Sequence, residues 1–223
     1  MKTVKDNYEG TSLFNPGCKS VCKDNQIAIA RLKRLARQKP EVSIYFSGEG
    51  KFAIDWGDGR KENLTLLGRG VRFKQNYSGR ASRTITISGD IITLNCDANE
   101  LTGLDLSKST SLKNLNCILN LLTNLDVSKN TELVSLSCHG NLLTNLDVSK
   151  NTALKDLSVG NSRGSDSDNH GYNKFTSEAY NVLFGTLHSN TIDKKFITVD
   201  KESDCDRKIA TDKGWEVRAV QYW

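Results

Sequence analysis

Apolar and polar positions in residues 91–162 recur with a fixed period of 21 residues. Three rows align: IITLNCDANELTGLDLSKSTS from Ile91, LKNLNCILNLLTNLDVSKNTE from Leu112 and LVSLSCHGNLLTNLDVSKNTA from Leu133. A partial fourth row, LKDLSVGNS, begins at Leu154. A repeat of this length predicts a solenoid, in which each repeat is one coil and the first residues of each coil form a short strand. Stacked coils then place these strands in one parallel sheet.

The leucine spacing also predicts which side chains fill the solenoid. In the second row the interior positions are Leu112, Leu115, Cys117, Leu122, Leu125 and Val127, and the next coil starts at Leu133. One coil cannot bury these side chains alone, so its neighbours must cover them. Polar residues recur too. Asparagines 99, 120 and 141 are expected to satisfy backbone groups where the strands end, and Asp105, Asp126 and Asp147 to hold local turns.

Three cysteines, Cys96, Cys117 and Cys138, occupy the same position in successive repeats. Stacked strands lie about 4.8 Å apart, and their side chains run parallel, whereas a disulfide needs Cβ atoms that converge to roughly 3.8 Å. The column is therefore predicted to be buried, reduced thiols that act as small apolar fillers. A metal or redox ladder is the alternative, but no histidine or carboxylate shares the column.

The shared pattern, L-x-x-L-x-C-x-x-N-x-L-T-x-L-D-[LV]-S-K-x-T, is the signature of leucine-rich repeats. It resembles the cysteine-ladder repeats of internalin J and of secreted surface proteins of Bacteroides-type bacteria. That resemblance implies a curved solenoid, secretion to the cell surface and a role in adhesion or protein binding. The predicted fold class is α+β: a short solenoid of 21-residue repeats, with an N-terminal β cap and an α/β C-terminal cap.

The segment 41–90 is predicted to be the N-terminal β unit. The stretches EVSIYFSG, KFAIDWGDG, VRFKQNYS and SRTITISG alternate apolar and polar residues between glycine-rich turns. The run from Asp55 to Gly59, DWGDG, resembles a turn of PKD-like, immunoglobulin-type domains. Trp56 is expected in the core, and Asp58-Gly59 to form a turn with positive φ. A calcium site at Asp55 and Asp58 is the alternative.

The segment 163–223 is predicted to be the C-terminal cap. A helix should start at Thr176 or Ser177 and run to about Leu187. KKFITVD reads as a strand, CDRKIATDKG as a short helix and WEVRAV as a last strand. The preceding loop, Asp166 to Gly171, half-resembles a calcium loop but has His170 where a carboxylate belongs, which favours a solvated loop.

Net charge is concentrated in the N-terminal segment, 1–40. These residues carry nine Lys/Arg and three acids, or +6, so the other 183 residues sum to −1 in a chain of +5. A helix from Asp24 to about Gln38 is predicted, with its charges solvated; anionic membrane or nucleic-acid binding are the alternatives. Cys18 and Cys22 could pair with each other, or one could pair with Cys205, if the compartment oxidises.

The remaining sequence excludes several classes. It contains no HExxH, G-x-S-x-G or Walker loop, which predicts a protein that is not an enzyme and has no cofactor or metal. The near-neutral body disfavours nucleic-acid binding. No run of 18 apolar residues indicates a transmembrane segment, and the N-terminus, MKTVKDNYEG, lacks the apolar stretch of a signal peptide. A monomer is expected.

The strand positions that alternate with the leucines are the candidate binding residues on the concave face. They are Thr93, Asn95, Asp97, Asn114, Asn116, Ile118, Ser135, Ser137, His139, Asp156, Ser158 and Gly160. This set is small, polar and lacks the Trp, Tyr or Arg of a typical protein hot spot. An unknown protein ligand is what the family resemblance implies. The face itself either binds weakly through hydrogen bonds or binds nothing, in which case contacts come from another surface. A glycan bound through hydrogen bonds is the alternative.

Overall fold

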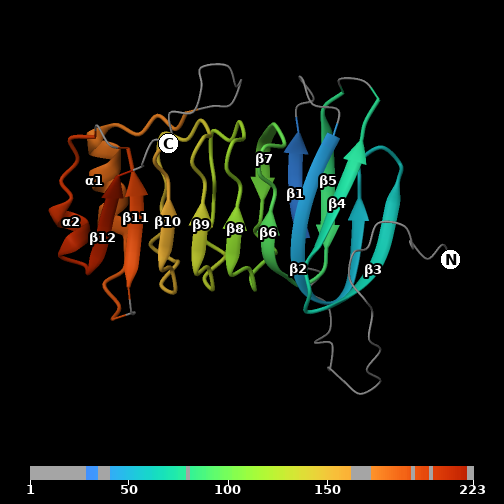
Figure 1. Ribbon diagram of the computed structural model, residues 1–223, viewed down its shortest axis with the longest axis horizontal. Coiled ribbons are helices and arrows are strands. Elements are labelled where there is room, and N and C mark those ends of the chain that lie inside the picture. The colour runs from blue at the N-terminus through green and yellow to red at the C-terminus, as the bar shows by residue number, and fades with distance from the viewer. Residues whose placement is uncertain are drawn as a thin grey trace.

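The computed structural model describes residues 29–34, 41–78, 81–161, 172–191, 194–200 and 203–219. These residues form a long run of strands with two short helices at its C-terminal end (Figure 1). The strands are β1 (Ile29–Arg34), β2 (Glu41–Asp55), β3 (Lys61–Leu67), β4 (Val71–Asn76), β5 (Arg83–Ser88), β6 (Ile91–Asn95), β7 (Leu101–Asp105), β8 (Asn114–Asn116), β9 (Ser135–Ser137), β10 (Asp156–Ser158), β11 (Lys195–Val199) and β12 (Trp215–Ala219). The helices are α1 (Ser177–Thr186) and α2 (Lys208–Thr211).

The repeat strands pair in parallel, as the period predicts. Leu94 of β6 pairs with Leu115 of β8, which pairs with Leu136 of β9, which pairs with Leu157 of β10. Each of these partners lies 21 residues further along the chain. β11 and β12 then continue the parallel sheet through Ile197 and its partner on β12. The chain is therefore rich in β structure and built as stacked coils.

The interior of the coils contains the residues that the leucine spacing predicts. All of them are at most 5% exposed: Leu112, Leu115, Cys117, Leu122, Leu125, Val127 and Leu133, and one coil further on Leu136, Cys138, Leu143, Leu146, Val148 and Leu154. Each coil has apolar side chains above and below it. Burial of this kind contributes about 25 cal/mol for each Å² of apolar surface removed from water, which makes it the main stabilising contribution to the stack.

The strand β2 joins the repeats to the N-terminal β structure. Its first half pairs with β4 and β6, and its second half pairs with β3 and β5. Two strands separated by a glycine-rich turn were predicted here, and that prediction is wrong: the chain stays extended through Gly48 and Gly50. A side chain at Gly48 would collide with the backbone oxygen of Asp90, so only glycine lets the strands approach this closely. β3 was not predicted.

The predicted N-terminal helix is wrong wherever the structure describes it. Residues 29–34 form β1, which lies between β5 and β7 and pairs antiparallel with both. Two neighbouring strands supply backbone partners on both sides, and this outweighs a local helical preference. Arg34, expected to be solvated, is 1% exposed; its Nε donates to the carbonyl oxygen of Asn99 at 3.1 Å. The rest of the predicted helix lies outside the described residues.

The C-terminal elements match the sequence prediction. Thr176 caps α1, since its side-chain oxygen accepts a hydrogen bond from the amide of Ala179 at 3.1 Å. Beyond α1, Lys195 links two turns by hydrogen bonds. It is 4% exposed, and its Nζ donates to the carbonyl oxygens of Asn190 at 2.8 Å and Lys213 at 2.7 Å. β11, α2 and β12 lie where a strand, a short helix and a strand were expected.

Candidate binding face

Two rows of side chains run across the sheet on the side opposite the leucines. The strand register places the first row at Ser47, Thr93, Asn114, Ser135, Asp156, Phe196 and Glu216. The second row is Tyr45, Asn95, Asn116, Ser137, Ser158, Thr198 and Arg218. We call these two rows the open face. Because side chains alternate along a strand, residues of the open face point away from the buried core.

The predicted site residues fall on or beside the open face. Seven of the ten principal candidates lie in its two rows: Asn95, Asn114, Asn116, Ser135, Ser137, Asp156 and Ser158. Asp97, Ile118 and His139 follow the strand ends and form a third, partly buried column. Gly160, also expected on this face, is buried, and a side chain there would collide with the backbone of Val199. Sequence periodicity therefore placed the centre of the face well.

The asparagines of the second row each accept a local hydrogen bond from the backbone. The side-chain oxygen of Asn95 accepts from the amide of Asp97 at 3.0 Å, and that of Asn116 accepts from the amide of Ile118 at 3.2 Å. Such bonds hold the turn after each strand. The carboxamide oxygens are thus engaged, which fixes the orientation of these two side chains on the face.

His139 is the titratable group of the third column. Its Nδ1 lies 3.1 Å from the hydroxyl oxygen of Ser158, and burial lowers its pKa below the ordinary value. The unfolded chain therefore takes up a proton at higher pH than the folded chain does. Stability conferred by neutral His139 is present above the ordinary histidine pKa of about 6.5 and is lost as pH falls below it.

We expect His139→Gln to weaken the pH dependence of stability. The free energy of unfolding of the unmodified chain should fall as pH decreases from about 7.5 to 5.5, in part because unfolded His139 becomes charged. The variant should show a smaller decrease over the same range, measured by urea unfolding at several pH values. Parallel curves for the two proteins would contradict the assignment.

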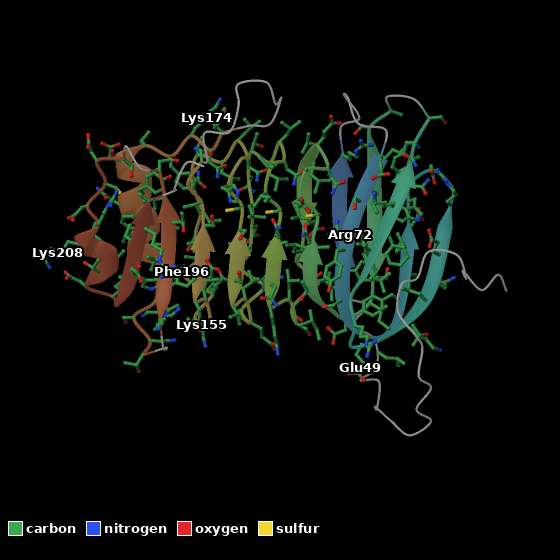
Figure 2. All side chains as sticks on the ribbon, viewed as in Figure 1. Glu49, Arg72, Lys155, Lys174, Phe196 and Lys208 are labelled. Carbon is green, nitrogen blue, oxygen red and sulfur yellow. The ribbon has the colours of Figure 1, made fainter. Side chains whose placement is uncertain are left out.

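The cysteine column is buried and reduced, as predicted. Cys96, Cys117 and Cys138 are each 0% exposed and free, and Figure 2 shows sulfur atoms in a line across the repeats. The Sγ of Cys117 lies 3.6 Å from the carbonyl oxygen of Ser137 in the next coil. Burial raises the pKa of Cys117 to about 12 and raises the pKa of the other two thiols. The thiolate, which is the reactive form, is therefore suppressed.

These thiols should be inert until the chain unfolds. Brief treatment of the native protein with iodoacetamide should leave all three unmodified, because the reagent needs an accessible thiolate. In urea all three should react. Mass spectrometry of the cysteine-containing peptides measures how much of each thiol is modified in the native protein and in urea. Modification of Cys117 in the native state at the rate seen in urea would show that the column opens.

Side-chain amides form a ladder at the strand ends. Asn120 is 0% exposed; its Oδ1 accepts from the amides of Asn99 at 3.1 Å and Leu101 at 2.9 Å. Its Nδ2 donates to the carbonyl oxygens of Cys96, Cys117 and Ile118, each at 3.0 Å. The expectation that these asparagines satisfy backbone groups is confirmed. Asp126 also holds its predicted turn, since its Oδ1 accepts from the amide of Ser128 at 2.9 Å.

A second amide ladder was not anticipated. It uses Asn130 and Asn151, the asparagines of the S-K-N-T element. The Nδ2 of Asn130 donates to the carbonyl oxygens of Leu106 at 3.1 Å and Ser109 at 2.8 Å, both in the preceding coil. Asn151 makes the equivalent bonds to Val127 and Asn130. The sequence signal is the recurrence of asparagine at this position in two successive repeats, where the first repeat has Ser109.

Asp55 and Asp58, for which a calcium site was the alternative interpretation, make turn hydrogen bonds. The Oδ1 of Asp55 accepts from the amide of Gly57 at 2.9 Å, and Asp58 binds the backbone and guanidinium of Arg60. Trp56 is 1% exposed and belongs to the core, as expected. Among the described residues no group of three His, Cys, Asp or Glu side chains is arranged to hold a metal.

The predictions for the 166–171 loop and for the cysteines outside the column remain. The loop from Asp166 to Gly171 lies outside the described residues, as do Cys18 and Cys22. Cys205 is buried and free, with its Sγ 3.2 Å from the hydroxyl oxygen of Ser203. Within the described ranges, no helix is long and apolar enough to cross a membrane.

Sequence reasoning missed the two ends of the open face. At one end Tyr45 of β2 lies beside Asn95, and Arg72 of β4 pairs with Tyr45. At the other end Phe196 of β11 pairs with Asp156, and Arg218 of β12 follows. Figure 2 shows Arg72 and Phe196 at opposite ends of the run of repeat strands. The face therefore does contain aromatic and arginine side chains, contrary to the expectation from the repeats alone.

Comparison with known proteins gives one structural similarity. No protein-family model matches the chain, and no curated protein shows significant similarity to it. A solved structure, the functional domain of InlJ from Listeria monocytogenes, which includes a cysteine ladder, is 29% identical with a TM-score of 0.35. The similarity covers 56% of this chain and 30% of that chain. At this TM-score the match carries no argument of its own, and the coil assignment rests on the strand register described above.

Proposed function

We propose that this chain is a non-enzymatic protein-interaction module that binds a partner protein through the open face. The observation that carries the proposal is the register: side chains from seven neighbouring strands, all of them polar except Phe196, form two continuous rows on one side of the sheet. Most of these side chains are short, so a partner's backbone can approach closely. The leucine side of the sheet is buried inside the coils. The two rows on the other side of the sheet therefore offer the partner a broad surface.

The same proposal includes a bacterial cell-surface or secreted location and a role in adhesion. Its support is the resemblance of the repeat motif to surface leucine-rich-repeat proteins, which is an argument from analogy. It also includes a capping role for the flanking elements. β2 pairs with the first repeat strand, and β11 with the last, so neither end of the stack leaves its sheet edge unpaired.

The proposal is tested by blocking the centre of the open face. Asn114 is exposed on the first row, and Thr123 is exposed in the same coil outside both rows. Asn114→Lys and Thr123→Lys therefore add the same side chain to one coil. Both variants and the unmodified chain are applied to arrays of extracellular proteins and, in parallel, to arrays of glycans. Protein binding that Asn114→Lys abolishes and Thr123→Lys preserves is the expected result.

Two outcomes would replace the proposal. Binding to glycans alone, resistant to high salt and lost in an Asn114→Ala/Asn116→Ala variant, would make the chain a glycan-binding module. Equal binding by the two lysine variants would exclude the open face as the contact surface. Release of peptides from residues 91–162 by protease treatment of intact bacteria, with an intracellular control protein, tests the location separately.

A further inference from the structure

Resting on the proposed function, we infer that the binding site extends beyond the repeats onto both flanks of the open face. There, Tyr45 with Arg72 and Phe196 with Arg218 form two anchors. The occupant is an extended polypeptide segment of the partner that lies across the strands. It carries a carboxylate at the Arg72 end and a basic side chain at the end near Asp156 and Glu216.

The first anchor is held in place by its surroundings. The Arg72 guanidinium carbon lies 6.0 Å from the centre of the Tyr45 ring, and its Nη1 donates to the hydroxyl oxygen of Ser43 at 3.1 Å. Gly70 makes room for the ring, because a Cβ there would lie 2.0 Å from the Tyr45 hydroxyl. Pre-positioned side chains lose less conformational entropy when a partner binds.

The positive charge of Arg72 is not neutralised by an ion pair with a described residue. The nearby Lys74 forms a 3.0 Å ion pair with Glu41, whereas no carboxylate of the described residues lies within ion-pair distance of Arg72. A guanidinium binds a carboxylate through two parallel hydrogen bonds and is well suited to interfaces. This end of the open face therefore favours an acidic group.

The second anchor differs from the first in its charges, because Arg218 is paired with a carboxylate. The Arg218 guanidinium carbon lies 4.0 Å from the centre of the Phe196 ring, and its Nε and Nη2 donate to the two carboxylate oxygens of Glu216 at 2.8 and 3.0 Å. Glu216 thus neutralises Arg218. Asp156 lies beside Phe196 as a second carboxylate. Burial raises its pKa, and Arg218 opposes that shift. Lys194 also acts electrostatically on Glu216, so the formal charges around this anchor balance. Among the described residues Asp156 has no ion-pair partner, and this carboxylate is the group that favours a basic side chain.

The spacing of the anchors suits a peptide. Tyr45 and Phe196 stand on β2 and β11, which are five strand steps apart in the sheet order. At about 4.8 Å for each step this is about 24 Å, which about seven or eight extended residues span. Aromatic residues and arginine are the side chains that typically dominate binding at protein interfaces. The short polar residues between the anchors can bond to a peptide backbone.

The test uses phage-displayed peptides of about ten residues, a length that exceeds the anchor spacing. Peptides are selected on the full chain and then measured by fluorescence anisotropy. We expect selected sequences to place Asp or Glu and Lys or Arg about seven residues apart. Arg72→Glu should weaken their binding at least tenfold and should shift a new selection toward Lys or Arg in place of the acid. Phe196→Ala should also weaken binding at least tenfold.

Matched controls separate recognition from general effects. Lys129→Glu makes the same charge change as Arg72→Glu at an exposed residue away from the open face, and Val182→Ala truncates an exposed apolar residue on α1. Both should alter affinity less than twofold, and urea midpoints of all variants should agree. Absence of any selected sequence, or equal losses for Arg72→Glu and Lys129→Glu, would overturn the inference.

The outcome is distinguishable from failure of the proposed function. If Asn114→Lys abolishes capture of partner proteins while Arg72→Glu and Phe196→Ala leave it unchanged, the module binds through the repeat centre alone and the flank inference is wrong. If binding is found only on the glycan arrays, both the proposed function and the polypeptide occupant are wrong.

Discussion

Asn120→Ala is expected to lower the free energy of unfolding by about 4 kcal/mol. The side chain makes five hydrogen bonds to backbone groups, two as acceptor and three as donor, at 2.9–3.1 Å. Its partners belong to two adjacent coils. The bonds to the amides of Asn99 and Leu101 and to the carbonyl oxygen of Cys96 are buried, so these groups have little access to water once alanine replaces the amide. An unsatisfied buried polar group costs about 1–3 kcal/mol, so the losses accumulate. Loss of one ladder asparagine should thus cost about as much as loss of one core leucine.

Urea unfolding measured by circular dichroism gives the comparison. Asn124→Ala is the matched control, because Asn124 lies in the same coil but is exposed. That control should change stability by less than about 0.5 kcal/mol. If Asn120→Ala costs less than about 1 kcal/mol, the interior hydrogen bonds contribute little beyond those that water would supply.

Leu136→Ala is expected to cost about 3–5 kcal/mol of unfolding free energy. Leu136 is 0% exposed on the central strand β9, between Leu115 and Leu157. Truncation removes its apolar contacts and leaves a cavity that rigid neighbouring coils cannot fill. Because each coil contacts only its neighbours, the damage should also be local in space.

Hydrogen exchange checks the second part of this prediction. Amides of β8, β9 and β10 should lose protection in Leu136→Ala, while β3 and β5 in the N-terminal structure should lose less. Leu67→Ala provides the control with the same substitution, since Leu67 is 73% exposed. A loss of stability no larger than that of Leu67→Ala would contradict the stacked-core description. A uniform loss of protection would show that the chain unfolds as one unit.

Much of the structure follows from the repeat alone. The 21-residue period determined the strand register from Leu94 to Leu157, the buried leucines and the reduced cysteine column. It also placed the centre of the open face. A repeat makes this possible because each coil meets a near-copy of itself, so a local pattern specifies the non-local contact as well.

The last position of the amide ladder is not predicted by the 21-residue period. The period predicts Ser162 at the position equivalent to Asn141, but Asn173 makes the equivalent hydrogen bonds. Its Oδ1 accepts from the amide of Leu143 at 3.0 Å, and its Nδ2 donates to the carbonyl oxygens of Cys138 and Val159 at 3.0 Å. The position is set by the unsatisfied backbone groups in space, and any nearby asparagine can fill it.

The sequence by itself determined the coils, their interior and the polar rows, since these depend on near neighbours that repeat. Only the tertiary structure decided that residues 29–34 are a strand, that Arg34 is buried beside Asn99, and that Tyr45 and Phe196 end the open face. These features depend on which strands become neighbours outside the repeat. That choice is made by packing and backbone pairing between distant segments, which local propensity does not encode.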